Sequence, residues 1–371
     1  MFKSAIYDDF FCIADQCTFS CCKGDWNVSL QKDEMEIYAT EPYISKGVNY
    51  VKKAMRMREN GTCVFLNEKG LCKLVCKYGP DVLSRTCTRF PRLSRDYCGV
   101  EEAFLSNACP KVLDMLANTP TPLAFVVEGE PLTEEYLSQS TVQARDIIID
   151  ILQYAKIPLW KRLYIAHSAC VKLENCKDME YVEILLRYSD VGYLDQTAEA
   201  LDRIPCGIET ILPKMRAMYN HVNYANIGKM YFDEYIADSY DKKGDWGIDE
   251  ISDKRKDFND WLKNWNAYFE NYCVNAVTEL LAVESLGEFK KRIIQLIIEV
   301  SLAVFTVFEN YRMGKRTDRT DIFNISCYYS RIIEHNRVEV NNFVESLLTK
   351  EQFVSGDFFV LCKSMDYESE A

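Results

Sequence analysis

The feature of this sequence that most limits its possible folds is a concentration of cysteine near the N-terminus. Of the 16 cysteines in the 371-residue chain, ten lie in residues 1–109. Four of these, Cys12, Cys17, Cys21 and Cys22, fall within eleven residues. Such short spacings let one stretch of backbone surround a metal centre, because each thiolate must come within about 2.3 Å of its metal. The N-terminal part of the chain is therefore expected to fold around a ligand.

The oxidation state of these thiols depends on the cellular compartment. The first 16 residues contain no apolar run of signal-peptide length, and Asp8 and Asp9 interrupt them. Cysteines of a protein that is not exported stay reduced, and clustered reduced cysteines usually bind metal. We therefore expect a cytoplasmic protein with a metal or iron–sulfur site. A disulfide framework would need a secretory route that the sequence does not show.

Cysteines further along the chain can complete the coordination when the chain folds back. The candidate metal ligands are Cys12, Cys17, Cys21, Cys22, Cys63, Cys72, Cys87 and Cys109. Adjacent Cys21 and Cys22 tend to point in different directions, so one of them is expected to support the site from outside or to serve another site. Cys76 and Cys98 lie outside the tight spacing and are expected to be ordinary buried thiols. Zinc and iron–sulfur clusters both accept four thiolates, so the residues leave the metal open.

Positive charge is concentrated in the same part of the chain. Residues 46–95 contain 12 Lys and Arg but three acidic residues, which gives this stretch a net charge of +9, although the whole chain carries −12. The remainder therefore carries −21. Positive charge lowers the pKa of nearby thiols and stabilises anionic thiolate clusters. It equally attracts phosphates, or forms a solvated surface without a partner.

The sequence predicts a mostly α protein in two parts. Residues 1–116 show little sustained periodicity, apart from a helical pattern at 33–60, and are predicted to form a small loop-rich cysteine domain. Residues 117–133 contain three prolines around an apolar run at 125–127 and are predicted to be a linker with one strand. Thr133 is a predicted helix cap. Residues 134–371 are predicted to form an all-α domain that folds independently, with helical patterns at 159–174, 178–189, 207–232, 254–284, 288–313, 320–335 and 338–363.

Several other functional signals are missing from the sequence. No membrane-spanning segment is expected, because the apolar run at 293–308 is short and contains Gln295 and Glu299. It is expected to be a buried helix, with peripheral membrane contact as a lesser alternative. The three histidines, His167, His221 and His335, are not clustered and are expected to be core or surface residues. No glycine-rich dinucleotide-binding turn occurs, so a doubly wound methyltransferase fold is not expected.

The order of the cysteines and their neighbours resembles the flagellin lysine N-methylase family. The resemblance begins with Cys12, Cys17, Cys21 and Cys22 followed by Lys23, Gly24 and Trp26, although in the family Trp usually follows the Gly directly, whereas Asp25 intervenes here. It continues through residues 63–72 (CVFLNEKGLC), Gly79, residues 83–92 (LSRTCTRFPR) and Cys109-Pro110. A weaker likeness occurs at residues 270–275 (ENYCVN). The match covers about residues 8–115 and fixes eight cysteines in order.

This resemblance implies methyl transfer from S-adenosylmethionine to lysine side chains of flagellin in the cytoplasm. It also implies an oxygen-sensitive [4Fe-4S] cluster held by these cysteines, with zinc as the alternative metal. A free lysine has a pKa of about 10.4, so at neutral pH only about one in two thousand is nucleophilic, and polar methyl transfer needs desolvation or a base. The sequence identifies no catalytic residue, S-adenosylmethionine site or oligomeric state.

Two other functions compete with the methylase. The first is a non-catalytic zinc- or cluster-binding module that contacts nucleic acid or protein through residues 46–95. Nucleic acid is not the expected partner, because that stretch offers few aromatic residues for stacking, namely Tyr50, Phe65, Tyr78 and Phe90. The second is a redox or cluster-carrier protein, which would need an accessible thiol pair such as Cys21 and Cys22.

Overall fold

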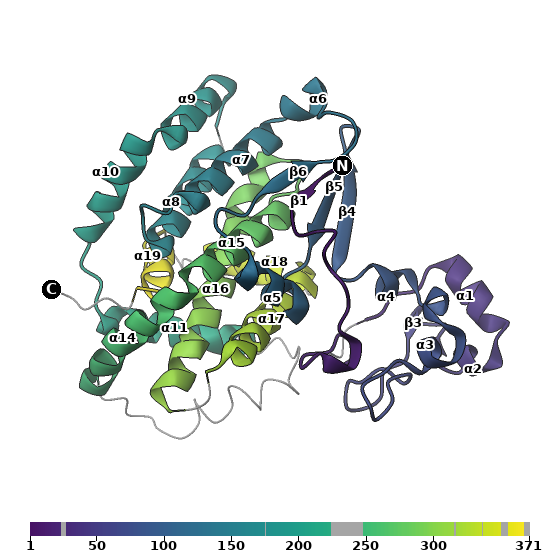
Figure 1. Ribbon diagram of the computed structural model, residues 1–371. Helices are drawn as coiled ribbons and strands as arrows, with labels where there is room; N and C mark the ends of the chain where they lie inside the picture. The colour runs from purple at the N-terminus through teal and green to yellow at the C-terminus, as the bar shows by residue number, and fades with distance from the viewer. Residues whose placement is uncertain are drawn as a thin grey trace.

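The computed structural model describes residues 1–23, 27–174, 176–223, 248–314, 317–335, 337–349 and 355–366. It has a mostly helical body, with a smaller lobe on one side (Figure 1). The N-terminal elements are β1 (Phe2–Ser4), η1 (Ala14–Gln16), α1 (Lys32–Ala39), α2 (Pro42–Ser45), β2 (Val48–Asn49), β3 (Ala54–Met55), α3 (Lys73–Tyr78), η2 (Pro80–Val82), α4 (Arg85–Arg89), β4 (Arg92–Tyr97), β5 (Val100–Leu105), α5 (Pro110–Asn118) and β6 (Phe125–Val127).

After β6, the described residues form helices and no further strand. These are α6 (Glu134–Leu137), α7 (Ser140–Gln153), α8 (Leu159–Leu173), α9 (Asp178–Ser189), α10 (Val191–Asp202), α11 (Ile208–Asn223), α14 (Ile248–Leu262), η3 (Lys263–Trp265), α15 (Asn266–Leu280), η4 (Leu286–Glu288), α16 (Phe289–Arg312), α17 (Arg319–His335), α18 (Arg337–Thr349) and α19 (Ser355–Lys363). The predicted cap is confirmed, because the Thr133 hydroxyl accepts a hydrogen bond from the Tyr136 N–H at 3.1 Å.

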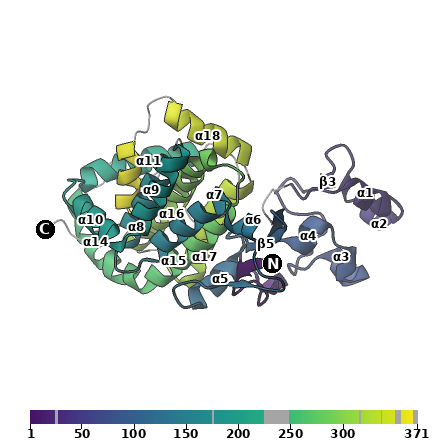
Figure 2. The ribbon, with the colours of Figure 1, turned by 90° about the horizontal axis from the view of Figure 1, so that it is seen from above.

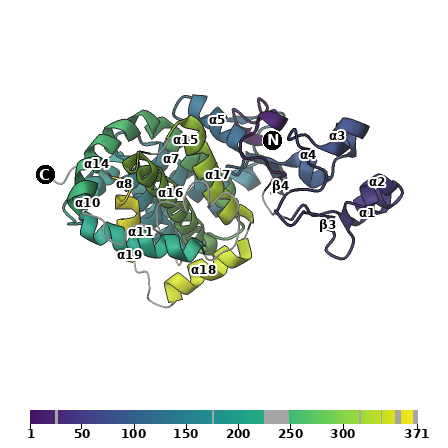
Figure 3. The same ribbon diagram turned by 90° about the horizontal axis from the view of Figure 1, so that it is seen from below.

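Helix α16 forms the centre of the body and is covered by α8, α15, α17 and α19 (Figures 2 and 3). It is long and apolar enough to cross a membrane, but its apolar stretch is entirely buried among the other helices. Its all-round burial explains why Gln295 and Glu299 are enclosed together with aliphatic side chains. The expectation of a buried helix at 293–308 is confirmed.

A four-stranded sheet joins the N-terminus to the helical body in the order β4-β5-β1-β6. Strands β4 and β5 form an antiparallel hairpin whose tip, Cys98-Gly99, has two successive positive φ angles. Strand β1 runs parallel to β5 and antiparallel to β6, so β6 is the strand predicted at 125–127. The hairpin was not predicted, because β4 lacks an apolar alternation.

Residues 20–90, here called the cysteine lobe, project from the body beyond the sheet (Figures 1 and 2). The lobe has a small apolar core of its own: Val28, Leu30, Tyr38, Ile44, Val48, Met55, Phe65 and Leu74. The helix predicted over 33–60 is wrong after Ser45. There the chain turns at Gly47, which lies against the Phe65 ring, and then forms the β2–β3 pair. Tertiary packing of the short segment thus overrides its helical pattern.

The apolar core of the body extends across the predicted linker at 117–133. Leu105, Val112 and Leu113, which precede the linker, are buried in the same cluster as Ile148 and Tyr272, which follow it. Strand β5 and helix α5 therefore pack with the helical body, although both were assigned to the N-terminal domain. The boundary between residues 1–116 and 134–371 stays a prediction, and this shared apolar core is a reason to test it.

Several predicted helices differ from the observed ones in extent. The pattern at 254–284 is divided by the η3 turn into α14 and α15, and α10 was not predicted. The pattern at 338–363 corresponds to α18 and α19. The end of the predicted 207–232 helix, beyond Asn223, lies outside the described residues.

Candidate metal centre

Two predicted ligands, Cys72 and Cys109, directly precede the helices α3 and α5. Burial raises the pKa of both thiols, to about 11 for Cys109. Hydrogen bonds from N–H groups in the first helical turn act in the opposite direction and favour the thiolate. The backbone N–H groups therefore oppose burial, but burial is the larger effect and the net pKa shift of both thiols is upward.

Two other ligands, Cys17 and Cys63, lie in loops with a similar local arrangement. Burial raises the pKa of both thiols, to about 11 for Cys63. The N–H of Phe19 hydrogen-bonds the Cys17 sulfur, and the N–H of Phe65 hydrogen-bonds the Cys63 sulfur. Such N–H···S contacts, two residues after the cysteine, suit thiolates bound to a metal or cluster.

The first group of thiols lies where the N-terminal segment meets the body. A negative charge on the Cys12 sulfur raises the pKa of Cys17, and a negative charge on the Cys17 sulfur raises the pKa of Cys109. Cys12 also accepts a hydrogen bond from the Ala14 N–H at 3.4 Å. We call Cys12, Cys17 and Cys109 the junction thiols.

Arg331 of α17 brings a positive charge to the junction thiols. The Arg331 side chain is 7% exposed. Its positive charge acts to lower the pKa of Cys17 and Cys109, against the larger upward effect of burial. Its Nη2 donates to the Phe19 carbonyl at 2.6 Å, and its Nε donates to the Ala108 carbonyl at 3.1 Å. The guanidinium also lies 4.2 Å from the centre of the Phe19 ring. Arg331 thus connects the two loops that carry Cys17 and Cys109.

The second group comprises Cys22, Cys63, Cys72 and Cys87 in the cysteine lobe, here called the lobe tetrad. Charges on Cys22, Cys63 and Cys72 each raise the pKa of Cys87, which burial has already raised to about 12. Charges on Cys22 and Cys72 likewise raise the pKa of Cys63. The predicted ligands are therefore gathered, but in two neighbouring groups.

The thiols of Cys21 and Cys22 have pKa values shifted in opposite directions. The Cys21 thiol donates a hydrogen bond to the Cys22 sulfur. This bond raises the pKa of Cys21 well above its usual value and lowers the pKa of Cys22 to about 7. Cys22 is thus the thiolate of the pair, and Cys21 supports it. Gly24, Asp25 and Trp26, which complete this motif, lie outside the described residues.

The remaining cysteines include two incorrect predictions. Cys76 is exposed and Cys98 is partly exposed at the hairpin tip, so neither is the buried thiol expected. Cys327 was not considered as part of the site, yet it is buried on α17 beside the junction thiols and donates to the Ala108 carbonyl at 3.0 Å. The spacing of Cys327 and Arg331, four residues apart on one helix, was the available sequence signal.

The loop that precedes Cys109 is held by buried side chains of α15. Asn275 donates to the Leu105 carbonyl at 2.6 Å and to the Asn107 side-chain oxygen at 2.7 Å. Asn107 in turn donates to the Tyr272 carbonyl at 3.0 Å. The residues of the weak motif at 270–275 therefore support the strong motif at Cys109-Pro110.

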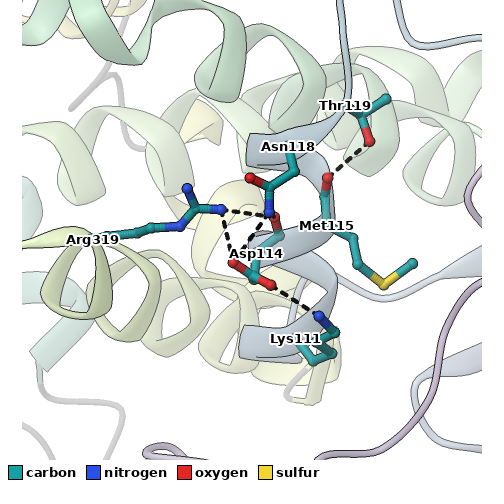
Figure 4. A network of polar contacts seen from close by, with 6 residues as sticks. All are labelled: Lys111, Asp114, Met115, Asn118, Thr119 and Arg319. Atoms are coloured by element: carbon teal, nitrogen blue, oxygen red, sulfur yellow. Dashed lines mark hydrogen bonds and ion pairs between the residues drawn. The ribbon is translucent and has the colours of Figure 1, made fainter.

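Helix α5, which begins after Cys109, is fixed by a second set of polar contacts with α17 (Figure 4). Arg319 donates to an Asp114 carboxylate oxygen at 2.8 Å, and Lys111 donates to the other at 3.0 Å. Burial raises the pKa of Asp114, but the hydrogen bonds and the positive charges of Lys111 and Arg319 together lower it more, so the net shift is downward. Asp114 therefore remains ionised and anchors α5 near neutral pH.

The donor set fits a thiolate-bound metal or iron–sulfur centre. All eight predicted ligands are free thiols, and backbone N–H groups and Arg331 contribute to the surroundings of Cys17 and Cys109. Within the described part of the chain, however, no three Cys, His, Asp or Glu side chains are already close enough to hold a single metal ion. Binding would therefore draw the sulfurs together and ionise them.

A cavity of about 720 Å³ lies in the cysteine lobe. It is lined by Asn27, Asn49, Lys52, Ala54, Met55, Arg56, Met57 and Arg58. Three cations face it and none of these residues is aromatic. Arg58 already donates to Thr62 at 3.0 Å and to the Val64 carbonyl at 2.9 Å. The cavity is suited to a small anion more than to stacked bases.

The histidine that can be described is a core residue, as expected. His167 is buried between Tyr164 and Phe358, and burial lowers its pKa to about 4. The side chains of His221 and His335 lie outside the described residues.

Comparison with known proteins decides the family. The family model described as the FliB lysine N-methylase C-terminal domain matches residues 145–361, which is more than half of the chain. The chain belongs to the FliB lysine N-methylase family. This match covers α7 to α19, the part that supplies Arg331, Cys327 and Asn275 to the site.

Individual relatives match a shorter part of the chain. The flagellar biosynthetic protein FliU of Salmonella muenchen is 28% identical over 136 residues, which are 33% of this chain and 80% of FliU. Lysine-N-methylases of Salmonella choleraesuis and Salmonella typhimurium are 27% and 28% identical over the same length. Those alignments cover about a third of each methylase, 34%. No solved structure matches the chain.

Proposed function

We propose that this chain transfers methyl groups from S-adenosylmethionine to lysine side chains of flagellin in the cytoplasm, and that it depends on a cysteine-bound [4Fe-4S] cluster. The observation that carries the proposal is the contact between the cysteine motif and the part of the chain that matches the FliB domain. Arg331 of that domain hydrogen-bonds the loops that carry Cys17 and Cys109. The names of two relatives, lysine-N-methylase and flagellar biosynthetic protein, support lysine methylation and a flagellar substrate.

The junction thiols are the proposed ligands of the cluster. A [4Fe-4S] cluster is usually held by four thiolates, and the junction thiols provide three. When bound, the cluster would therefore supply an iron that is open to another ligand. The N–H groups of Phe19, Lys111 and Val112 would stabilise the ionised sulfurs, and Arg331 would offset their negative charge. Cys327 is beside them but directs its S–H to the Ala108 carbonyl.

Metal and sulfide analysis of anaerobically purified protein tests this proposal. We expect iron together with acid-labile sulfide, and a broad visible absorbance that bleaches in air. Stoichiometric zinc without sulfide would contradict the cluster and leave a non-catalytic metal-binding protein.

The cationic cavity of the cysteine lobe favours a second candidate function. A non-catalytic module would use Lys52, Arg56 and Arg58 to contact a phosphate or acidic segment of a partner. Zinc-loaded protein that binds such a ligand but leaves flagellin unmethylated would support this alternative.

A further inference from the structure

We propose that Glu41, Tyr43 and Tyr78 form a binding site for a methylated lysine side chain, and that Lys77 occupies this site in the free protein. The three residues, here called the ammonium cage, come from α2 and α3 of the cysteine lobe, and none is a candidate metal ligand. Binding of a methylated ammonium does not depend on methyl transfer by this protein. Its use in recognising a methylated product rests on the proposed function.

Two short helices bring the tyrosines of the cage together. Glu41 precedes α2, and its carboxylate accepts a hydrogen bond from the Tyr43 N–H at 3.3 Å. Tyr78 is the last residue of α3, and its ring centre lies 6.2 Å from that of Tyr43, with 56° between the ring planes. Tyr43 also lies 6.0 Å from the ring of Phe65, a residue of the lobe core. The Tyr43 and Tyr78 side chains are 38% and 36% exposed, so solvent reaches the pair.

The ammonium group of Lys77 shows that the cage accepts a cation. Its Nζ lies 4.3 Å from the ring centre of Tyr43 and 4.6 Å from that of Tyr78. Aromatic rings attract cations at such distances. The Nζ also donates a hydrogen bond to the Tyr78 hydroxyl at 2.8 Å, and this hydroxyl donates to a Glu41 carboxylate oxygen at 2.9 Å. Two rings, one hydroxyl and one carboxylate thus surround a single ammonium.

The position of Lys77 on α3 explains only part of this arrangement. A lysine in the last turn of a helix is favoured by the carbonyl groups there. That preference does not require Tyr43 or Glu41, which belong to a separate segment of the chain. Lys77 is exposed, and cation–π contacts at exposed positions are weak. An ammonium from another molecule can therefore displace Lys77 from the cage.

The chemistry of the cage selects among the methylation states of lysine. Methylation keeps the positive charge but removes N–H groups, so a methylated ammonium loses less hydration than free lysine when it enters between rings. The Tyr78 hydroxyl accepts one N–H, because its own hydrogen is directed to Glu41. The ligand that fits is therefore mono- or dimethyl-lysine, which keeps an N–H, whereas trimethyl-lysine has none. Such a site would retain a substrate protein that already carries one modified lysine.

Binding of synthetic peptides to the full chain tests the proposal. Three labelled peptides would share a Gly/Ser sequence around one lysine that is unmodified, dimethylated or trimethylated, and fluorescence anisotropy would measure their affinities. The dimethylated peptide should bind most tightly. Lys77→Ala should tighten its binding several-fold, because the cage is emptied, and Glu41→Gln should weaken it several-fold. Tyr50→Ala is the matched control and should have no effect, because this exposed tyrosine contacts Ser45 instead of the cage.

Tyr78→Phe provides a second test, because it keeps the ring and removes the hydroxyl. In this variant the preference for the dimethylated over the trimethylated peptide should disappear. Equal affinity of the wild type for all three peptides, or unchanged binding in Lys77→Ala and Glu41→Gln with the helical circular dichroism signal retained, would overturn the proposal. Peptide binding without methylation of flagellin would count against the proposed function alone. Methylation of flagellin without peptide binding would count against the cage alone.

Discussion

Arg331 is the residue through which the helical body acts on the cysteines. It is buried and hydrogen-bonds both the Phe19 and the Ala108 carbonyl, close to Cys17 and Cys109. Removing its charge takes away two hydrogen bonds and the positive charge nearest to the junction thiols. Loss of a buried charged donor of this kind typically costs about 1–3 kcal/mol.

We therefore expect Arg331→Met to lower the iron content of anaerobically purified protein several-fold. Arg319→Met is the matched control, because Arg319 lies on the same helix and contacts α5 but is 44% exposed. Iron analysis of both variants measures the effect. Full iron retention in Arg331→Met would show that the arginine does not support the centre.

At the residue scale, the sequence indicated cysteine as the candidate ligand, but it did not indicate which cysteines lie near one another. Spacing indicated eight thiols as candidate ligands, because short intervals between cysteines are themselves a constraint, and which of them bind a metal stays a prediction. It did not separate Cys17 from Cys63, since that separation depends on tertiary contacts such as the bond between Cys63 and Cys22. Cys327 and Arg331 were missed because their partners are more than 200 residues away in the sequence.

At the element scale, α15, α16 and α17 enclose a carboxyl group. Glu299 of α16 accepts hydrogen bonds from Tyr272 of α15 and Ser330 of α17. Burial raises the pKa of Glu299 to about 7, although these bonds partly oppose the shift. The folded state therefore holds this proton more tightly than the unfolded state does.

The stability of the body should consequently decrease as the pH rises through the interval between the two pKa values of Glu299. The unfolded value is near 4.5 and the folded value is about 7. Glu299→Gln keeps the shape without the titration, so its melting temperature should vary less across this interval and exceed that of the wild type above it. Thermal melts followed by circular dichroism measure both. Parallel profiles for the two proteins would contradict this account of Glu299.

Helices were predicted more successfully than strands. Long apolar periodicity identified α8, α9, α16 and α17 nearly to their ends, because each buries one face or more in the body. Strand β1 escaped prediction because its partners, β5 and β6, come from distant segments. The β4–β5 hairpin is local, but β4 lacks the apolar alternation that would have indicated a strand. The 33–60 pattern failed for the related reason that packing around Phe65 determines the turn at Gly47.

At the scale of the whole molecule, the helical body is completed by N-terminal residues. Phe19, Leu105 and Val112 are buried in the same core as the helices that follow residue 134. The sequence predicted that the helical part folds alone, since its periodicity looked sufficient. Apolar side chains supplied from before the linker could not be recognised without the fold.

We now expect a fragment beginning at Pro131 to be insoluble or poorly folded. It would expose the surface covered by α5, and each large apolar side chain removed from a core costs about 1.5–3 kcal/mol. Solubility and the far-ultraviolet circular dichroism spectrum measure the outcome. A soluble fragment with a cooperative thermal transition would support the predicted domain boundary and contradict this expectation.

The most direct test of the central claim is mass spectrometry of flagellin from the same organism after incubation with this protein. The reaction would contain anaerobic, iron-loaded protein and S-adenosylmethionine, with the Cys17→Ser variant as the control. We expect lysine-containing flagellin peptides to gain the mass of one or more CH₂ units with the wild type and none with the variant. Unmodified flagellin in the presence of intact, iron-loaded protein would contradict the proposed methyl transfer.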